Sequence, residues 1–167
     1  MKIIAQGVCA AQGFKASGIH AGIRSNNNKL DLALIVSEVE AEAAAIYTKN
    51  KVKAAPIYMT QENLSNGKAR AVICNSGNAN ACTSDGETIA YETCQILANQ
   101  LQISPQDVVV ASTGVIGQQL PLKPFIDNIP RLIAELGDKS HLAAEAIMTT
   151  DLKIKEIAAT FEIDGVE

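Results

Sequence analysis

Two polar segments hold the residues of this sequence that are best suited to chemistry. Residues 75–80 place three asparagines, a serine and a glycine within six positions, so they offer several hydrogen-bond donors. Residues 112–117 contain Thr113 followed by Gly114. A hydroxyl next to a glycine can direct an O–H and an unobstructed backbone N–H at one point, which is the arrangement that stabilises a developing oxyanion.

A third segment, residues 148–151, contains Thr149 and Thr150 at the expected end of a helix, where two hydroxyls could face a ligand. Each of the three segments also has a purely structural interpretation. Residues 75–80 could form a turn whose amides bond their own backbone, and Gly114 could serve a strand-to-loop turn at positive φ. The paired threonines could bond the end of their helix. The residues alone leave both interpretations open.

The chain lacks a recognisable nucleophile with its base. We find no Ser-His-Asp or Cys-His set, no P-loop and no dinucleotide-binding fingerprint. The two histidines, His20 and His141, are far apart, and the four cysteines show no CxxC spacing: Cys9, Cys74, Cys82 and Cys94. We therefore expect no metal site and four reduced, half-buried thiols. The donors without a nucleophile suggest part of an active site.

The flanking sequence predicts elements that would position these segments. Apolar runs at 30–37, 69–74 and 108–111 predict strands, the last of them buried on both faces, and further strands are expected near 44–49 and 156–163. Helices are expected over 87–101, from Pro124 to Gly137, and over about 140–148, the last capped by Asp138 or Ser140. The first two polar segments directly follow strands, and strand ends are common places for sites.

The irregular alternation of strands and helices indicates a mixed α+β fold rather than a regular βαβ array. With 167 residues and no Gly/Pro-rich linker, residues 1–167 are expected to form a single domain. The net charge of −4 and the absence of a basic cluster argue against nucleic-acid binding. No apolar run is long enough for a membrane span, and the first residues do not form a signal peptide, so a cytoplasmic location is expected.

The polar segments also carry a family resemblance. From Gly13 almost to the last residue, the sequence resembles the ornithine acetyltransferase (glutamate N-acetyltransferase) family of arginine biosynthesis. Each motif alone is weak, but their collinear order makes coincidence improbable. The strongest matches are residues 75–82 (NSGNANAC), 112–117 (STGVIG) and 146–151 (AIMTTD).

The resemblance implies a self-cleaved precursor. Members of the family cut themselves between an alanine and a threonine, and the new N-terminal threonine becomes the nucleophile. The two pieces remain together as an α2β2 heterotetramer with a four-layer αββα sandwich. By this resemblance the present chain is the α chain, its partner is the β chain, Thr113 and Gly114 form the oxyanion hole, and Thr149 contacts substrate.

The implied reaction moves the acetyl group of N-acetylornithine to glutamate through an acetyl-threonine intermediate, without metal or cofactor. Some members also use acetyl-CoA. The family's α chain continues through a glycine-rich segment with a substrate-binding lysine, which this sequence lacks. After Asp151 the family usually has Thr-x-Pro-Lys, of which only Lys155 matches here. Two alternatives remain: a self-processing aminopeptidase-like hydrolase and a non-catalytic binding subunit.

Overall fold

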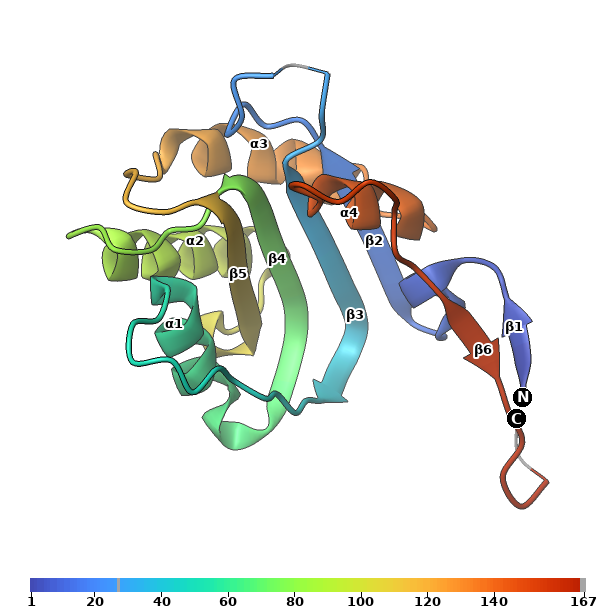
Figure 1. Cartoon of the computed structure of the whole chain (residues 1–167). Coiled ribbons are helices and arrows are strands. Elements are labelled where there is room, and N and C mark those ends of the chain that lie inside the picture. Colours follow the sequence, from blue (N-terminus) through green and yellow to red (C-terminus); the bar gives the residue numbers. More distant parts are fainter. Residues whose placement is uncertain (27, 166–167) are drawn as a thin grey trace.

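A four-stranded mixed sheet forms the centre of the structure (Figure 1). The computed structural model describes residues 1–26 and 28–165. The strand order is β2-β3-β4-β5. Its strands are β2 (Phe14–Ile19), β3 (Leu32–Glu42), β4 (Lys68–Asn78) and β5 (Val108–Val115). The first two pairs are antiparallel, whereas β4 and β5 are parallel, so the carboxyl ends of β4 and β5 meet at one edge of the sheet.

Three helices cover one face of this sheet. They are α1 (Ala55–Asn63), α2 (Gly86–Leu101) and α3 (Lys123–Ala134). The predicted apolar stripe of α2 is confirmed, because Ala90, Cys94 and Leu97 are all buried. These side chains join the main core with buried residues of all four strands and of α3, including Ile19, Leu34, Ile73, Val110, Phe125 and Leu132. Since α2 connects β4 to β5, it also provides the crossover that parallel strands require.

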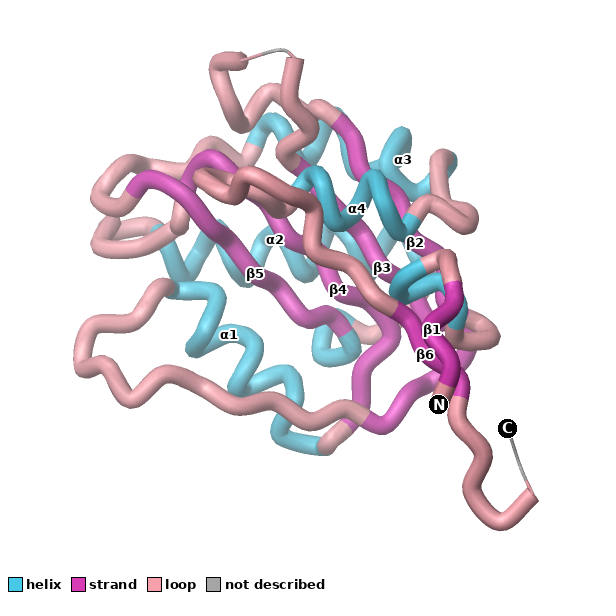
Figure 2. Tube along the Cα trace, turned by 45° about the vertical axis from the view of Figure 1, so that its right-hand side comes forward, coloured by secondary structure: helices cyan, strands magenta, loops and turns pink. Residues whose placement is uncertain are grey.

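The helix α4 (Ser140–Ala146) lies on the opposite face of the sheet, over β2 and β3 (Figure 2). A side chain at Gly18 of β2 would not fit there, because its Cβ would lie 2.1 Å from the carbonyl oxygen of Leu142. The glycine therefore allows the backbone of α4 to approach the strand closely. A small cluster of Ala16, Ala33, Ala143 and Ala146 is buried between them.

A separate two-stranded ribbon carries the two ends of the chain (Figure 1). In it, β1 (Lys2–Ile4) pairs antiparallel with β6 (Ala158–Thr160), and Ile3 lies opposite Ala159. The expected strand near 156–163 is therefore present but short. The segment that leads from α4 to this ribbon crosses the second face of the sheet.

The prediction of a strand near 44–49 is wrong. Instead, β3 continues to Glu42, beyond the predicted end of the strand at residue 37. Glutamates on its outer half extend the pairing with β4, because the Lys68 ammonium lies 3.2 Å from the Glu40 carboxylate and 2.6 Å from that of Glu42. The strand bulges after Val36, and no strand pairing is present over 43–50.

Three further expectations also need correction. The second expected helix ends at Ala134, not at Gly137, because the backbone of Gly137 exchanges hydrogen bonds of 2.9 and 3.1 Å with Ala16 of β2. Ser140 does not cap α4, since its Oγ instead accepts a hydrogen bond from the Val8 amide. The strand over 108–111 buries only one side, and Val109 and Ala111 are half-buried on the other. The sequence patterns indicated none of β1, β2 and α1.

Candidate active site

The first two polar segments lie side by side at the carboxyl ends of the parallel strands. In the register of β4 with β5, Asn75 lies opposite Ser112, Ser76 opposite Thr113, and Gly77 opposite Gly114. The register becomes irregular immediately afterwards, at Asn78. The sequence placed each segment after a strand, and the structure brings the two together because those strands are parallel neighbours.

Gly114 occupies a position that only glycine fits. Its φ is +138°, a conformation that residues with a side chain rarely adopt. A Cβ at this position would lie 2.3 Å from the carbonyl carbon of Gly77 and 2.5 Å from the amide nitrogen of Asn78. The close approach of the two backbones fixes the end of β5 against the end of β4. The amide of Gly114 is thus part of a rigid strand end and not of a free loop.

The asparagines of residues 75–80 are used by the fold. The Asn75 side chain donates to the carbonyl of Asn78, and the Asn78 side chain donates to the carbonyls of Gln118 and Gln119. The Asn78 side-chain oxygen accepts from the amide of Asn80, whose own side chain donates to Gly86. The structural interpretation of this segment therefore holds, and its amide donors serve the scaffold.

Thr149 reaches this edge of the sheet because α4 ends beside β4. The Ser76 hydroxyl donates a 2.5 Å hydrogen bond to the carbonyl of Ala146, the last residue of the helix. The chain then passes through Thr149, whose amide donates to the Asp151 carboxylate at 3.5 Å, and through the exposed Thr150. The sequence expectation that the helix stops before the two threonines is confirmed.

The end of β5 and the threonines after α4 border one cavity of about 650 Å³. Half-buried Thr113 and exposed Gly114 line it from β5, and Thr149 and Thr150 line it from the segment after α4. The remaining lining comes from the loop that joins β2 to β3, from the ends of β4 and β5, and from the segment after β5: Ile23, Arg24, Ser25, Asn26, Gly77, Val115 and Gln118. The three residues singled out from the sequence, Thr113, Gly114 and Thr149, thus face a common space.

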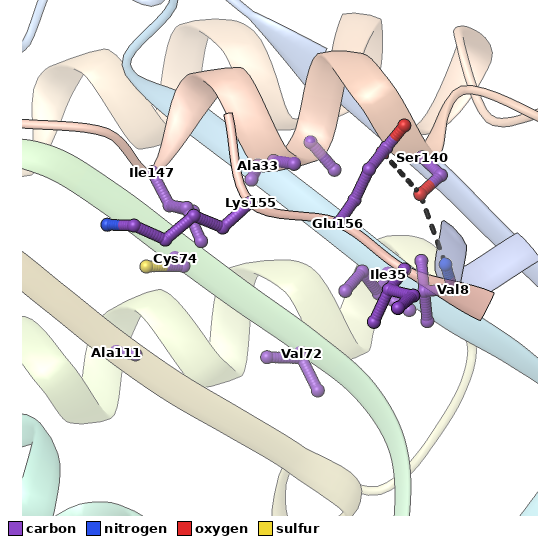
Figure 3. Close-up of a pocket in the computed structure, with 13 residues that line it drawn as sticks. Val8, Ala33, Ile35, Val72, Cys74, Ala111, Ser140, Ile147, Lys155 and Glu156 are labelled. Carbon is purple, nitrogen blue, oxygen red and sulfur yellow. Dashed lines mark hydrogen bonds between the residues drawn. The ribbon is translucent and has the colours of Figure 1, made fainter. Parts of the chain in front are cut away.

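A second cavity, of about 580 Å³, lies on the sheet face that carries α4 (Figure 3). Figure 3 shows Val72, Cys74 and Ala111 on the strands beneath it, with Lys155 and Glu156 at its margin. Its one hydroxyl, that of Ser140, already accepts from Val8 and donates to Glu156. This lining is suited to packing, whereas the first cavity is lined by threonine hydroxyls and the Arg24 guanidinium.

Two side chains near these cavities have pKa values that depart from their ordinary ones. The Lys155 ammonium, which bonds the Asp151 carboxylate, holds the pKa of that carboxyl below its usual range, and the Thr149 amide acts in the same direction. Burial raises the pKa of the Cys74 thiol to about 11. Asp151 therefore stays ionised beside Thr149, while Cys74 stays a neutral thiol below the sheet edge.

One charged residue of the first cavity could not be foreseen from the sequence. Arg24 is the one charged side chain among the described residues that line it. It follows the Ala21-Gly22-Ile23 stretch, but a single arginine in a polar loop carries no signal of its own.

Within residues 1–26 and 28–165, no three His, Cys, Asp or Glu side chains gather as a metal site would require. None of the described helices is long and apolar enough to cross a membrane.

Two solved structures share the fold of this chain. A crystal structure of arginine biosynthesis bifunctional protein ArgJ from Bacillus halodurans is 41% identical, with a TM-score of 0.84, covering 90% of this chain and 80% of that one. The ornithine acetyltransferase of Mycobacterium tuberculosis, crystallised with ornithine, is 39% identical with a TM-score of 0.85, covering 91% of this chain and 84% of that one. The chain therefore has the α+β fold of the ornithine acetyltransferase class.

The family follows from the sequence comparison. The chain belongs to the ArgJ family, whose model matches residues 15–167. The arginine biosynthesis bifunctional protein ArgJ of Dehalococcoides mccartyi is 43% identical over 162 residues, which is 96% of this chain. The match covers only 40% of that relative's length. The chain thus spans about two fifths of the curated relatives it matches.

Proposed function

We propose that this chain is the oxyanion-stabilising α chain of a glutamate N-acetyltransferase that moves the acetyl group of N-acetylornithine to glutamate in arginine biosynthesis. The observation that carries the proposal is the shared cavity, in which a hydroxyl and a glycine at the end of β5 face the threonines that follow α4. Family membership supports the choice of substrate, as does the ornithine with which one solved relative was crystallised.

In this mechanism a threonine at the N-terminus of a partner β chain attacks the acetyl carbonyl, with its own α-amine as the base. The negative charge that develops on the carbonyl oxygen is met by the Thr113 Oγ–H and the Gly114 N–H. Because the backbone of Gly114 is held against Gly77, these donors need little reorganisation when the charge forms. Thr149 contacts the amino-acid part of the substrate. Ornithine then leaves, and glutamate accepts the acetyl group.

The second face of the sheet is an argument for a partner chain. Over β4 and β5 it carries half-buried apolar side chains, among them Val72, Cys74 and Ala111, which a second sheet would cover. In the proposed assembly residues 1–167 form a single domain, and the β chain supplies the second sheet and outer helices of an αββα sandwich. Two such pairs form the α2β2 heterotetramer. The length of the relatives leaves ample sequence for this second half.

The experiment that tests the proposal begins with the complete native protein. Denaturing intact-mass analysis with N-terminal sequencing of every polypeptide should reveal a second chain that starts with threonine. The purified protein should then transfer label from N-[acetyl-¹⁴C]acetylornithine to glutamate, and should do so with neither metal nor nucleotide added. A separate incubation with acetyl-CoA and glutamate tests the second donor.

The rival functions predict different results. An aminopeptidase-like hydrolase would release free amino acids from peptides and would not label glutamate. A binding subunit would show no threonine-initiated partner and no transfer. Either result would overturn the acetyltransferase proposal.

A further inference from the structure

We propose that Arg24 is a positioning residue of this site: it keeps the Thr149 segment in a fixed relation to the Thr113–Gly114 strand end. The inference rests on the proposed acetyl transfer. Arg24 lines the cavity from the loop between β2 and β3, whereas Thr113 and Thr149 come from elements far away in the sequence. A side chain that bonds both the end of β4 and the residue before Thr149 can set the geometry of donors it does not itself provide.

The backbone of Arg24 is held by a buried carboxylate. Asp31 is fully buried, and its two oxygens accept hydrogen bonds from the amides of Ala21 at 2.6 Å and Arg24 at 2.8 Å. His20 lies 3.4 Å from the same carboxylate and 2.9 Å from the carbonyl of Lys29. The loop is thus closed at its base, so the side chain of Arg24 starts from a defined point.

The guanidinium of Arg24 joins two other segments. Its Nε donates a 3.1 Å hydrogen bond to the Ser76 hydroxyl at the end of β4. Its Nη2 donates to the carbonyl of Met148, the residue immediately before Thr149. The planar group directs these donors at fixed angles, which a lysine ammonium on a flexible stem cannot reproduce.

The aliphatic part of Arg24 completes a line of contacts to the proposed oxyanion hole. Gly77 has a φ of +97°, and a Cβ on it would lie 2.6 Å from Cγ of Arg24. On its other side the backbone of Gly77 abuts Gly114. Close contacts therefore run from Gly114 through Gly77 to Arg24, and then by hydrogen bond to Met148 beside Thr149. Movement of the arginine would loosen the link between the two halves of the site.

The test uses the complete protein and the variants Arg24→Met and Arg24→Lys. Arg24→Met keeps much of the volume and removes the donors, so we expect kcat for acetyl transfer to fall roughly 10- to 100-fold through misplacement of the site. Arg24→Lys should recover little of the loss, because its charge is retained but its second donor direction is not. Amide hydrogen exchange should accelerate at residues 148–151 while the core amides around Leu97 keep their protection.

Arg70→Met is the matched control. Arg70 also donates from its Nη2 to backbone carbonyls, at 3.2 Å to Ser37 and 2.7 Å to Glu38, but it lies near the start of β4. A merely structural role for arginine would lower the melting temperature in both variants and leave kcat of the folded protein unchanged. We expect Arg70→Met to behave in this way and Arg24→Met to lose kcat.

Coupling to Thr113 gives a second measurement. If Arg24 acts through the oxyanion donors, then Arg24→Met should cost less than about threefold in a Thr113→Ala background, because that donor is already gone. Two outcomes with an active wild type would overturn this inference and leave the proposed acetyl transfer intact. One is an unchanged kcat in folded Arg24→Met, and the other is fully additive losses in the double variant. An inactive wild type overturns the proposed acetyl transfer and this role with it. If Arg24→Met does not fold, Arg24→Gln takes its place in every comparison.

Discussion

Residues 75–80 and residues 112–117 look equally suited to chemistry in the sequence, and they lie next to each other in the structure. Both lie at the carboxyl ends of parallel strands and pair residue by residue as far as Gly77 and Gly114, yet they differ in what they offer. The first segment is buried apart from Gly77 and Ala79, and its asparagines bond carbonyls and amides of the chain. The second turns exposed from Gly114 onwards and borders the cavity.

The difference shows that the number of donors in a segment does not measure their availability. The asparagines build a rigid strand end against which the second segment rests, and Gly77 is the point where the backbones touch. A single hydroxyl and a glycine that face an open cavity are therefore better placed for catalysis than three amides that are already bonded. Changes in the first segment should act on stability, and changes in the second on activity.

The largest effect is expected at Thr113. Thr113→Ala removes one proposed oxyanion donor, so acetyl transfer should slow by about 10²–10³-fold, which corresponds to about 2.7–4 kcal/mol of transition-state stabilisation. The melting temperature should change little, because Thr113 is only half-buried. Steady-state kinetics and thermal unfolding of the complete protein provide the measurement.

Thr113→Ser is the matched control, because it keeps the hydroxyl and removes only a methyl group. It should retain much of the activity that Thr113→Ala loses. Equal losses in the two variants would show that the hydroxyl is not the group that matters.

The second effect is expected at Asn78, in the segment that serves the scaffold. Asn78→Ala removes the hydrogen-bond partners of the Gln118 and Gln119 carbonyls and of the Asn80 amide, at a residue that is only 4% exposed. We expect the free energy of unfolding to fall by roughly 2–3 kcal/mol, since buried polar groups lose their hydrogen bonds. Chemical denaturation measures the change.

Asn66→Ala serves as the control for the loss of an asparagine. The Asn66 side chain is exposed and accepts only from the Lys68 amide at 2.9 Å. Its removal should cost less than about 0.5 kcal/mol. If Asn78→Ala were as stable as Asn66→Ala but inactive, residues 75–80 would act in catalysis and not in the scaffold.

A third, smaller effect concerns the pH dependence of stability that arises from Cys74, the residue directly before the first segment. Burial raises the pKa of Cys74 from 9.0 to about 11, so between these values the unfolded chain has released a proton that the folded chain retains. The unfolded state then binds fewer protons, and stability is lost as the pH rises. The thiol should contribute a loss of roughly 1 kcal/mol per pH unit in this window.

Denaturation midpoints at pH 8 and pH 10.5 test this contribution. The wild type should lose more stability over the interval than Cys74→Ala or Cys74→Ser, neither of which titrates there. Identical losses in all three proteins would mean that burial does not raise the pKa of the Cys74 thiol in the folded state.

The smallest effect is expected at Ser112, which lies beside Thr113 on the same strand. Successive side chains of a strand point to opposite faces, and Ser112 does not line the cavity that Thr113, Gly114 and Thr149 share. Ser112→Ala should therefore change acetyl transfer by less than about threefold, a barrier change of well under 1 kcal/mol. A loss as large as that of Thr113→Ala would contradict the assignment of the oxyanion donor to Thr113 alone and would give the Ser112 hydroxyl a role.

The sequence predicted local elements well where a strong periodic pattern was present. The α2 stripe and the apolar runs that became β3, β4 and β5 were all visible. It failed where tertiary contacts decided the outcome. Gly137 pairs with Ala16 instead of ending a helix, and the glutamates of β3 are retained in a strand by Lys68 of its neighbour.

The family resemblance is confirmed, whereas the roles of Thr113, Gly114 and Thr149 remain predictions that the structure supports by placing them around one cavity. By itself, the sequence determined the secondary elements with a clear apolar period, the mixed α+β class and the three polar segments, because these depend on neighbours within a few residues. Only the tertiary structure decided which donors are free and that Arg24 belongs to the site. Hydrogen-bond partners up to 124 residues away occupy the amides and the guanidinium, and no local pattern encodes such distances.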